Sequence, residues 1–501
     1  MKIRFIFWIL LLLGISIRLV NINQPFLEYN ATRQVETAMV VRNFVSNGFN
    51  FLYPEVDDQG KGPTYLMQEF PLITAPLSGI CFVIKAIPEW LLRLTSVISF
   101  ILALIFFYKI VSFCWDEETA IIASIIFIFS PLSILMSRVF QPDMAMLSFI
   151  LICFYGFSKW SIIGQNKYIF PAIIGFTGAV LLKIVNLYIL IPIIYLAFIG
   201  IKGKKISYLG FVFFLFFSFI PIVWWWGIHA PRVRALFPNE YDIFGAAYIA
   251  QSIKEHIFYM PFYKEIFKHT AGAVLTPAIF LMFICGIFSY KNKNKFLYLW
   301  LAGFILFVML IPEQSKQEYY MLGVIPIAAI FSAKIMISVF TANRNKFFIK
   351  PLILIFTIAS TIAVIYWTLP KYFNTPEYSV IIEAGNVLDK IADKGDLIVA
   401  SYGYGPRLLY YCKRKGWTFL IDRNDLVEYY KTIETNKNKD SLRDFRLPIE
   451  DLEFLKNKGA KYFVLVNLKE LEKNIEFKKY LFLNYKIAAQ KSDSYVILKL
   501  N

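Results

Sequence analysis

Long apolar runs separated by short polar or basic stretches dominate the first 370 residues of the chain. A helix that crosses a membrane needs about 20 mostly apolar residues. We expect eleven spanning helices, at 4–20, 92–112, 119–137, 142–160, 168–182, 184–200, 206–226, 272–290, 295–312, 320–340 and 350–369. A twelfth apolar segment, 70–87, contains Pro71, Pro76 and Gly79.

The pattern changes after residue 370. Short alternating runs predict strands at 396–401, 461–466 and 495–500, and the spacing of apolar residues predicts an amphipathic helix over 377–394. We therefore expect a membrane part, 1–370, followed by a small soluble α/β domain, 371–501.

Composition agrees with a membrane protein. Hydrophobic residues make up 58% and charged residues 17% of 501 residues, against about 45–50% and about 25% in soluble proteins. This excludes an ordinary cytosolic enzyme. The five cysteines show neither a Cys-x-x-Cys pair nor the spacing of a metal site.

The positions of the basic residues explain much of the net charge of +17. Short cytoplasmic loops carry an excess of Lys and Arg, and clusters occur at Lys2 to Arg4, Lys159 to Lys167, Lys202 to Lys205, Lys291 to Lys295, and Arg344 to Lys350. All five lie on the cytoplasmic side if the chain begins inside and segment 70–87 does not fully cross. We therefore expect 70–87 to be re-entrant or surface-lying. A split or missed helix elsewhere would also place all five basic clusters on the cytoplasmic side. A nucleic-acid partner is not indicated.

This topology places four pieces on the outer face: a first loop, 21–91; a short turn, 138–143; a second large loop, 228–271; and the tail. In the first loop, we expect Arg33, Glu36 and Arg42 to lie near one another on a helix. A carboxylate there can take a proton from a hydroxyl group, and arginine can hold a phosphate through its planar fork. A solvated helix face held by ion pairs is the alternative.

Further charged residues are expected on the same face. Glu69 stands at the edge of segment 70–87, Arg138 and Asp143 share the short turn, and Lys183 interrupts an apolar stretch. Ionisable residues at membrane depth are often functional, although Lys183 can also snorkel to the interface and Asp143 can simply stabilise a helix start. The expected cations are Arg33, Arg42, Lys61, Arg138, Lys183 and Arg232, and a basic site at the outer leaflet favours a lipid-linked phosphate ligand.

Taken together, these motifs resemble the GT-C glycosyltransferases, in the branch that contains protein mannosyltransferases and lipid A aminoarabinose transferases. The matching pieces are Arg33-Gln34 with Glu36, Arg42-Asn43, Glu69-Phe70-Pro71, Ser130-Pro131, Arg138, Pro142-Asp143, Lys183, Tyr319-Tyr320 followed by Pro326, and Gly405 to Tyr411 followed by Trp417. Where many relatives carry an Asp-Glu pair in the first loop, this chain has Arg33-Gln34.

The resemblance implies a GT-C fold of about 11–13 transmembrane helices with a small C-terminal α/β domain outside the bacterial cytoplasmic membrane. It implies an inverting transfer of a sugar from a polyprenyl-phosphate donor to a lipid, glycan or protein acceptor. We expect Glu36 to be the catalytic base, with Glu28, Glu69 and Asp143 as alternatives. Arg33, Arg42, Lys61, Arg138, Lys183 and Tyr320 are the expected donor-phosphate residues.

Two other functions stay open from the sequence: a transporter or flippase for a lipid-linked sugar, and a polysaccharide polymerase or ligase. No cofactor is certain. A divalent metal ion beside Glu69 or His229 is left open, although no ligand spacing supports it.

Overall fold

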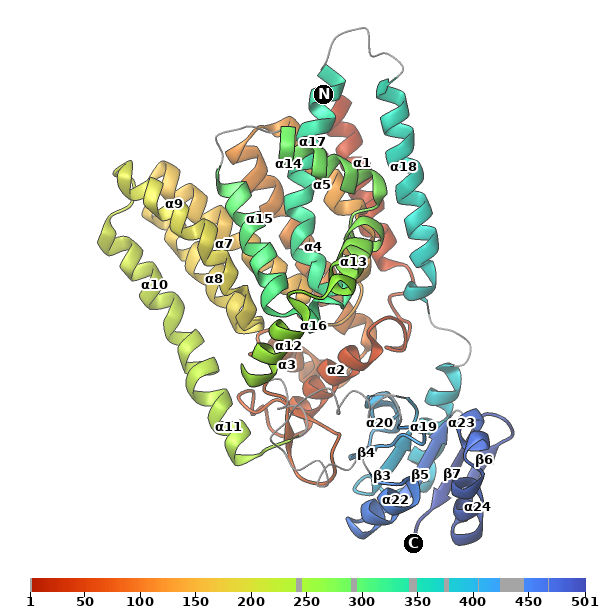
Figure 1. The fold of residues 1–501 in the computed structure, drawn as a ribbon. Coiled ribbons are helices and arrows are strands. Elements are labelled where there is room, and N and C mark those ends of the chain that lie inside the picture. Colours follow the sequence, from red (N-terminus) through yellow and green to blue (C-terminus); the bar gives the residue numbers. More distant parts are fainter. Residues whose placement is uncertain are drawn as a thin grey trace.

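The computed structural model describes residues 2–239, 246–289, 295–341, 349–373, 378–403, 405–423, 446–466 and 468–501. A bundle of helices makes up most of the molecule, and a small sheet domain formed by the C-terminal tail lies at one end of it (Figure 1). The chain begins at the opposite end of the bundle (Figure 1). Parts of two predicted basic clusters, 291–294 and 344–348, lie outside the described residues, as does Glu377.

Each of the eleven apolar segments predicted to span is mostly helical in its described part. The main helices of the bundle are α1 (Lys2–Leu19), α4 (Glu89–Cys114), α5 (Glu117–Phe129), α6 (Pro131–Met136), α7 (Asp143–Ile163), α8 (Ile169–Leu182), α9 (Leu190–Lys202), α10 (Tyr208–Ile222), α14 (Pro277–Ser289), α15 (Lys295–Leu310), α17 (Val324–Thr341) and α18 (Ile349–Thr368). Helix α7 packs against both α4 and α8. Helix α7 approaches α8 closely at Gly156 and Gly175, where an added Cβ would lie within 2.6 Å of a backbone nitrogen of the facing helix. Small residues at such crossings let membrane helices pack closely.

Fewer helices than predicted are long enough to cross a membrane on their own. By length and composition, six of the described helices qualify, or seven if the bent pair Met260–Val274 and Pro277–Ser289 is one span. The prediction of 11–13 spans treated each apolar run as one straight helix. In the structure, the run 119–137 breaks at Ser130, and Asn166–Leu182 and Lys295–Leu310 are shorter apolar helices. Because several of its helices are long and apolar enough to cross a membrane, the chain is a multi-pass membrane protein.

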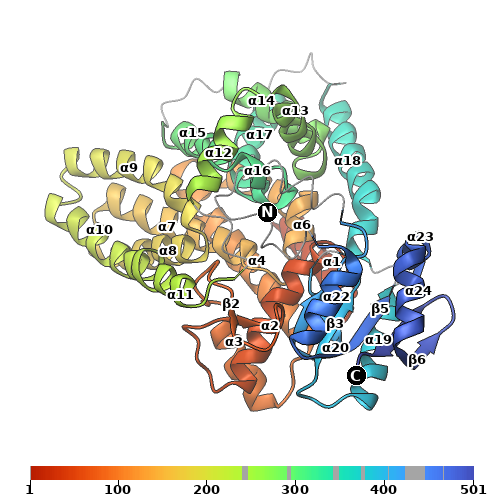
Figure 2. The ribbon, with the colours of Figure 1, turned by 60° about the horizontal axis from the view of Figure 1, so that its bottom comes forward.

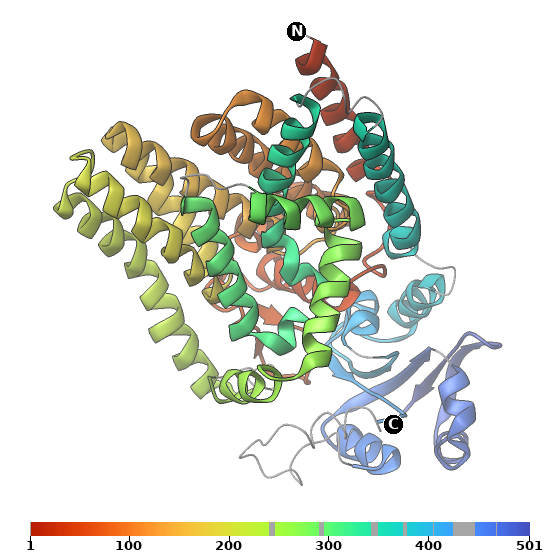
Figure 3. The same cartoon turned by 45° about the horizontal axis from the view of Figure 1, so that its top comes forward.

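The second large loop, 228–271, is mostly helical in its described part. It contains α11 (Ala230–Leu236), α12 (Ala246–His256) and α13 (Met260–His269). The chain then turns by 114° into α14, a bend visible in the green segment of Figure 3. A short helix, α16 (Pro312–Ser315), and a 3-10 turn, Glu318–Gly323, lead into α17.

The first loop folds into helix α2 (Ala31–Ser46), the short strands β1 (Glu55–Val56) and β2 (Thr64–Tyr65), and helix α3 (Thr74–Ile84). Helix α3 holds the segment predicted to be re-entrant or surface-lying. Its 11 residues extend only about 16 Å, which is less than the hydrocarbon thickness of about 30 Å. Helix α3 by itself therefore does not cross.

The tail is an α/β domain, as predicted. Its five strands lie in the order β4-β3-β5-β7-β6, with β4, β3 and β5 parallel and β7 antiparallel to both β5 and β6. The three predicted strands correspond to β3, β5 and β7. The elements are α19 (Ser379–Ile391), β3 (Leu397–Ser401), α20 (Arg407–Cys412), β4 (Gly416–Thr418), α22 (Pro448–Asn457), β5 (Ala460–Val466), α23 (Leu468–Lys473), α24 (Ile475–Asn484), β6 (Lys486–Lys491) and β7 (Tyr495–Lys499).

The first loop and the tail share one hydrophobic core, which the sequence did not reveal. Side chains of α2 and α3, such as Val35, Met39 and Cys81, belong to the same buried cluster as Ile381 and Leu409 of the tail. Figure 2 shows α2 beside α20. Backbone hydrogen bonds extend the contact, because the first loop pairs with the outer edge of β4: Gly416 N donates to the Asp57 carbonyl at 3.0 Å, and Gly60 N to the Gly416 carbonyl at 2.7 Å.

Candidate active site

Helix α2 places two of the predicted site residues on one face. Arg33 and Glu36 are three residues apart, and their side chains form an ion pair at 3.4 Å. Arg33 also pairs with Glu69, which comes from the segment between β2 and α3. Both carboxylates therefore face one guanidinium group, and the side chains of Arg33 and Glu36 expose only 20% and 9% of their surfaces.

Arg42 does not join this group, and the expectation that it would do so is wrong. Nine residues separate Arg33 from Arg42, which at about 100° per residue puts them on opposite sides of α2. Arg42 pairs with Asp57 and donates to the Tyr410 carbonyl of the tail at 2.8 Å. Its guanidinium carbon also lies 4.8 Å from the centre of the Tyr410 ring. Arg42 thus joins α2 to the tail.

A second charged group forms where the turn 138–143 meets the end of α8. Lys183 follows the last residue of α8 in an extended conformation, and its ammonium group pairs with Asp143, the first residue of α7. The Lys183 Nζ atom lies 4.3 Å from the centre of the Tyr320 ring and 5.0 Å from that of Tyr319. Gln141 Nε2 donates to the other Asp143 oxygen at 2.9 Å. The structure therefore brings together the predicted residues Asp143, Lys183 and Tyr320.

The Arg33 and Lys183 groups are neighbours. The backbone N–H of Phe70 donates to the Leu181 carbonyl at 3.0 Å, which brings the residue after Glu69 to within two residues of Lys183. The electrostatic environment of Arg33 also indicates that the two groups lie close together. Burial disfavours a charged Arg33, but Glu69, Glu36, Tyr319 and Asp143 more than offset this and raise its pKa.

Glu36 has the properties of a proton acceptor. Burial raises the pKa of its carboxyl group to about 7, although Arg33 opposes the rise. A general base is most effective when its pKa lies near the working pH. Burial beside a charged partner is a common arrangement at catalytic sites.

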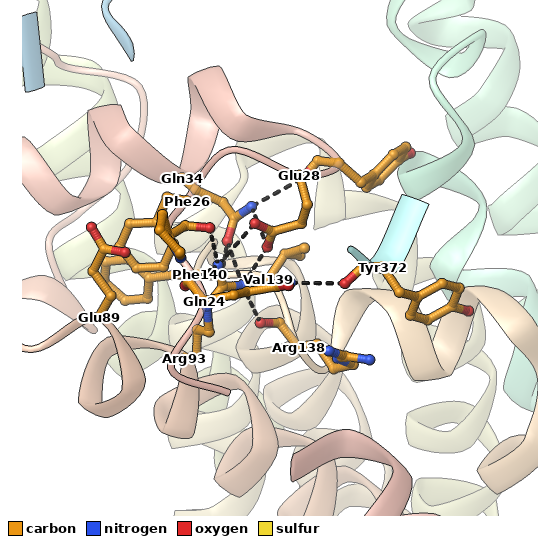
Figure 4. Close-up of polar contacts among 12 residues, drawn as sticks. Gln24, Phe26, Glu28, Gln34, Glu89, Arg93, Arg138, Val139, Phe140 and Tyr372 are labelled. Carbon is orange, nitrogen blue, oxygen red and sulfur yellow. Dashed lines mark hydrogen bonds and ion pairs between the residues drawn. The ribbon is translucent and has the colours of Figure 1, made fainter. Parts of the chain in front are cut away.

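Glu28, the first alternative to Glu36, belongs to a buried structural network. Both of its oxygens accept hydrogen bonds from Arg93, and each side chain exposes 2% of its surface. Gln34 Nε2 also donates to Glu28 at 3.1 Å, while Arg93 donates to the carbonyls of Gln24 and Pro25. Figure 4 shows Glu28, Gln34 and Arg93 turned toward one another. The signal that could have found Arg93 is a charged residue inside a predicted span.

The other two cations expected at the donor phosphate lie elsewhere. Arg138 is buried, donates to the Val20 carbonyl at 2.5 Å, and lies 5.4 Å from the centre of the Tyr372 ring. In Figure 4 its guanidinium points toward Tyr372, away from Glu28. Lys61 is exposed in the connection between β1 and β2.

Arg232 of the second loop is also exposed, and a neighbouring arginine makes the contact with the first loop instead. Arg234 donates to the carbonyl of Met67, two residues before Glu69. Arg234 thus joins the end of α11 to the segment that carries Glu69.

Comparisons with known proteins identify the fold. Residues 71–225 match the family model described as dolichyl-phosphate-mannose-protein mannosyltransferase. The structure is similar to that of ArnT from Cupriavidus metallidurans bound to undecaprenyl phosphate, with a TM-score of 0.59, 11% identity, and coverage of 98% of this chain and 97% of that chain. The chain has the GT-C glycosyltransferase fold.

A second similar structure is the archaeal oligosaccharyltransferase AglB from Archaeoglobus fulgidus, in complex with an inhibitory peptide and a dolichol-phosphate. Its TM-score is 0.57 at 12% identity, with coverage of 93% of this chain and 70% of that chain. Comparison with curated protein sequences gives no match. The GT-C fold predicted from the sequence is thereby confirmed.

At the two places where a metal ion was left open, the described side chains have other partners. Among the described residues, no group of three or more His, Cys, Asp or Glu side chains is placed to hold an ion. The Arg33 guanidinium already contacts both Glu36 and Glu69. His229 Nε2 lies 2.9 Å from the Leu52 carbonyl, and its ring stacks on Trp224.

Proposed function

We propose that this protein transfers a sugar from a polyprenyl-phosphate donor to an acceptor at the outer face of the cytoplasmic membrane. The observation that carries the proposal is the joined group of Arg33, Glu36, Glu69, Asp143 and Lys183, in which two cations and a buried carboxylate of raised pKa meet in a GT-C fold. The family match and the structures that contain lipid phosphates support it.

The two cations would act on the leaving group. As the bond between the sugar and the phosphate breaks, negative charge develops on the departing polyprenyl phosphate. Arg33 and Lys183 are held in place before the reaction by their carboxylate partners. Charges that are already oriented stabilise such a developing anion without reorganisation.

Glu36 would act on the acceptor. In its ionised form it accepts the proton of the acceptor hydroxyl while that oxygen attacks the anomeric carbon. A single displacement of this kind inverts the configuration at that carbon. Glu69 keeps Arg33 oriented, and Asp143 does the same for Lys183.

Reconstituted protein supplied with undecaprenyl phosphates that carry radiolabelled sugars, together with bacterial envelope lipids and glycans as acceptors, tests the proposal. Wild-type protein should move the label to an acceptor, and Glu36→Gln should abolish transfer but still bind undecaprenyl phosphate. Glu118→Gln, a change at an exposed position at the start of α5, is the matched control. Movement of the donor across the bilayer without transfer would instead indicate a flippase, and extension of a lipid-linked glycan would indicate a polymerase.

A further inference from the structure

The tail contacts α2 at the residue immediately before Arg33. Gly405 lies between β3 and α20, and its φ of +86° favours glycine. A Cβ atom at this position would lie 2.4 Å from Thr32 Cγ2 and 2.6 Å from Thr32 Oγ1. The tail backbone therefore approaches the first turn of α2 more closely than any residue with a side chain would allow.

The contact is held in place by the rest of the interface. The shared hydrophobic core fixes α2 against α20. Arg42 binds the Tyr410 carbonyl at 2.8 Å, nine residues along α2 from Arg33. The first loop is paired with β4 through Gly416. Because three separate contacts set the distance between the two parts, a bulkier residue at position 405 cannot be accommodated by the tail alone.

We propose that the tail is a working part of the catalytic centre, in which Gly405 is a positioning residue that sets the location of Arg33 through Thr32. This inference rests on the proposed function for the role of Arg33. It assigns to the tail a task in the site itself, in addition to any contact with the acceptor.

The size of the effect can be worked from the contact. To restore an ordinary separation of 3.4 Å from the 2.4 Å contact, Gly405→Ala must displace Thr32, and with it the first turn of α2, by up to about 1 Å. A misplacement of about 1 Å in a catalytic group can cost roughly 100-fold in rate. We expect Gly405→Ala to weaken undecaprenyl phosphate binding at least tenfold.

Gly60→Ala is the matched control. Gly60 also has a positive φ, +106°, and also lies in the interface between the first loop and the tail. A Cβ there would come within 2.7 Å of the Trp417 ring rather than of α2. Both variants should lower the thermal unfolding midpoint, but only Gly405→Ala should lower the affinity for undecaprenyl phosphate.

Thr32→Ala supplies a second test, because it removes both Thr32 atoms nearest to the added Cβ. In the double variant Thr32→Ala/Gly405→Ala, the affinity should return toward that of Thr32→Ala alone. The thermal midpoint should stay low, since the strain of alanine at a positive φ persists. Recovery of affinity without recovery of stability is a result that a merely structural role would not give.

The measurement is the binding of undecaprenyl phosphate to the full chain in nanodiscs, followed by native mass spectrometry. If the wild-type protein does not bind this lipid, the proposed function fails. If the wild-type protein binds and Gly405→Ala binds equally well, the positioning role is overturned. Equal losses in Gly60→Ala and Gly405→Ala, or a double variant that does not recover, would overturn it as well.

Discussion

Removing the charge of Glu28 tests whether this residue is structural or catalytic. In Glu28→Gln the side chain keeps its shape, but Arg93, which exposes 2% of its surface, loses the carboxylate that both of its terminal nitrogens contact. Removing one member of a buried ion pair typically costs about 3–5 kcal/mol. For a cooperative unit of 150–250 residues, about 2–4 °C per kcal/mol corresponds to a drop of roughly 6–20 °C in the unfolding midpoint.

A thiol-reactive fluorescent dye provides the assay. Cys81 of α3 and Cys412 of the tail are both buried in the shared hydrophobic core, so they become reactive when that core opens. The double variant Glu28→Gln/Arg93→Gln should lose less stability than the two single variants together, because it leaves neither charge unpaired. An unchanged midpoint in Glu28→Gln would refute the reasoning, and loss of transfer at an unchanged midpoint would return Glu28 to the list of catalytic candidates.

Three further outcomes are expected. Transfer should fall as the pH drops through about 7, because Glu36 must be ionised to accept a proton and its pKa is raised to about 7; a rate profile that is flat from pH 5 to 8 would contradict this. Lys183→Gln should weaken undecaprenyl phosphate binding more than Arg42→Gln does, whereas Arg42→Gln should lower the midpoint seen by the thiol dye, because Arg42 binds the Tyr410 carbonyl of the tail while Lys183 pairs with Asp143 of the bundle; the reverse pattern would exchange their roles. Treatment with EDTA should leave transfer unchanged, because Arg33 already contacts the carboxylates of Glu36 and Glu69. A loss of transfer that Mn²⁺ restores would reveal a metal site.

The sequence predicted local structure well. Apolar runs identified the helices of the bundle, and alternation identified β3, β5 and β7. Periodicity also placed Arg33 and Glu36 on one face of α2, because a separation of three residues is enough to predict proximity. The same reasoning failed for Arg42, which is six residues from Glu36 and faces the tail.

Contacts between distant segments could not be predicted in this way. The pairing of Lys183 with Asp143 and of Arg33 with Glu69 depends on how α7, α8 and the first loop pack. Arg93 was overlooked, and the structural role of Gln34 was not predicted, because both roles come from a network of partners on several segments. Whether a cation pairs with a carboxylate, as Lys183 does, or donates to a backbone carbonyl, as Arg138 does at Val20, depends on the tertiary structure.

The hydrophobic core shared by the first loop and the tail has a consequence for how the protein is made. The ribosome finishes α2 early, but helix α20, which packs against α2 and contributes Leu409 to the shared core, comes from the tail. Domains generally fold as units, and the N-terminal ones fold first during synthesis. Here, the first loop cannot complete its packing until the tail has been synthesised. A nascent chain that stops before α20 would insert its bundle into the membrane but leave α2 without the tail helix that packs on it, so maturation of the site depends on synthesis of the tail.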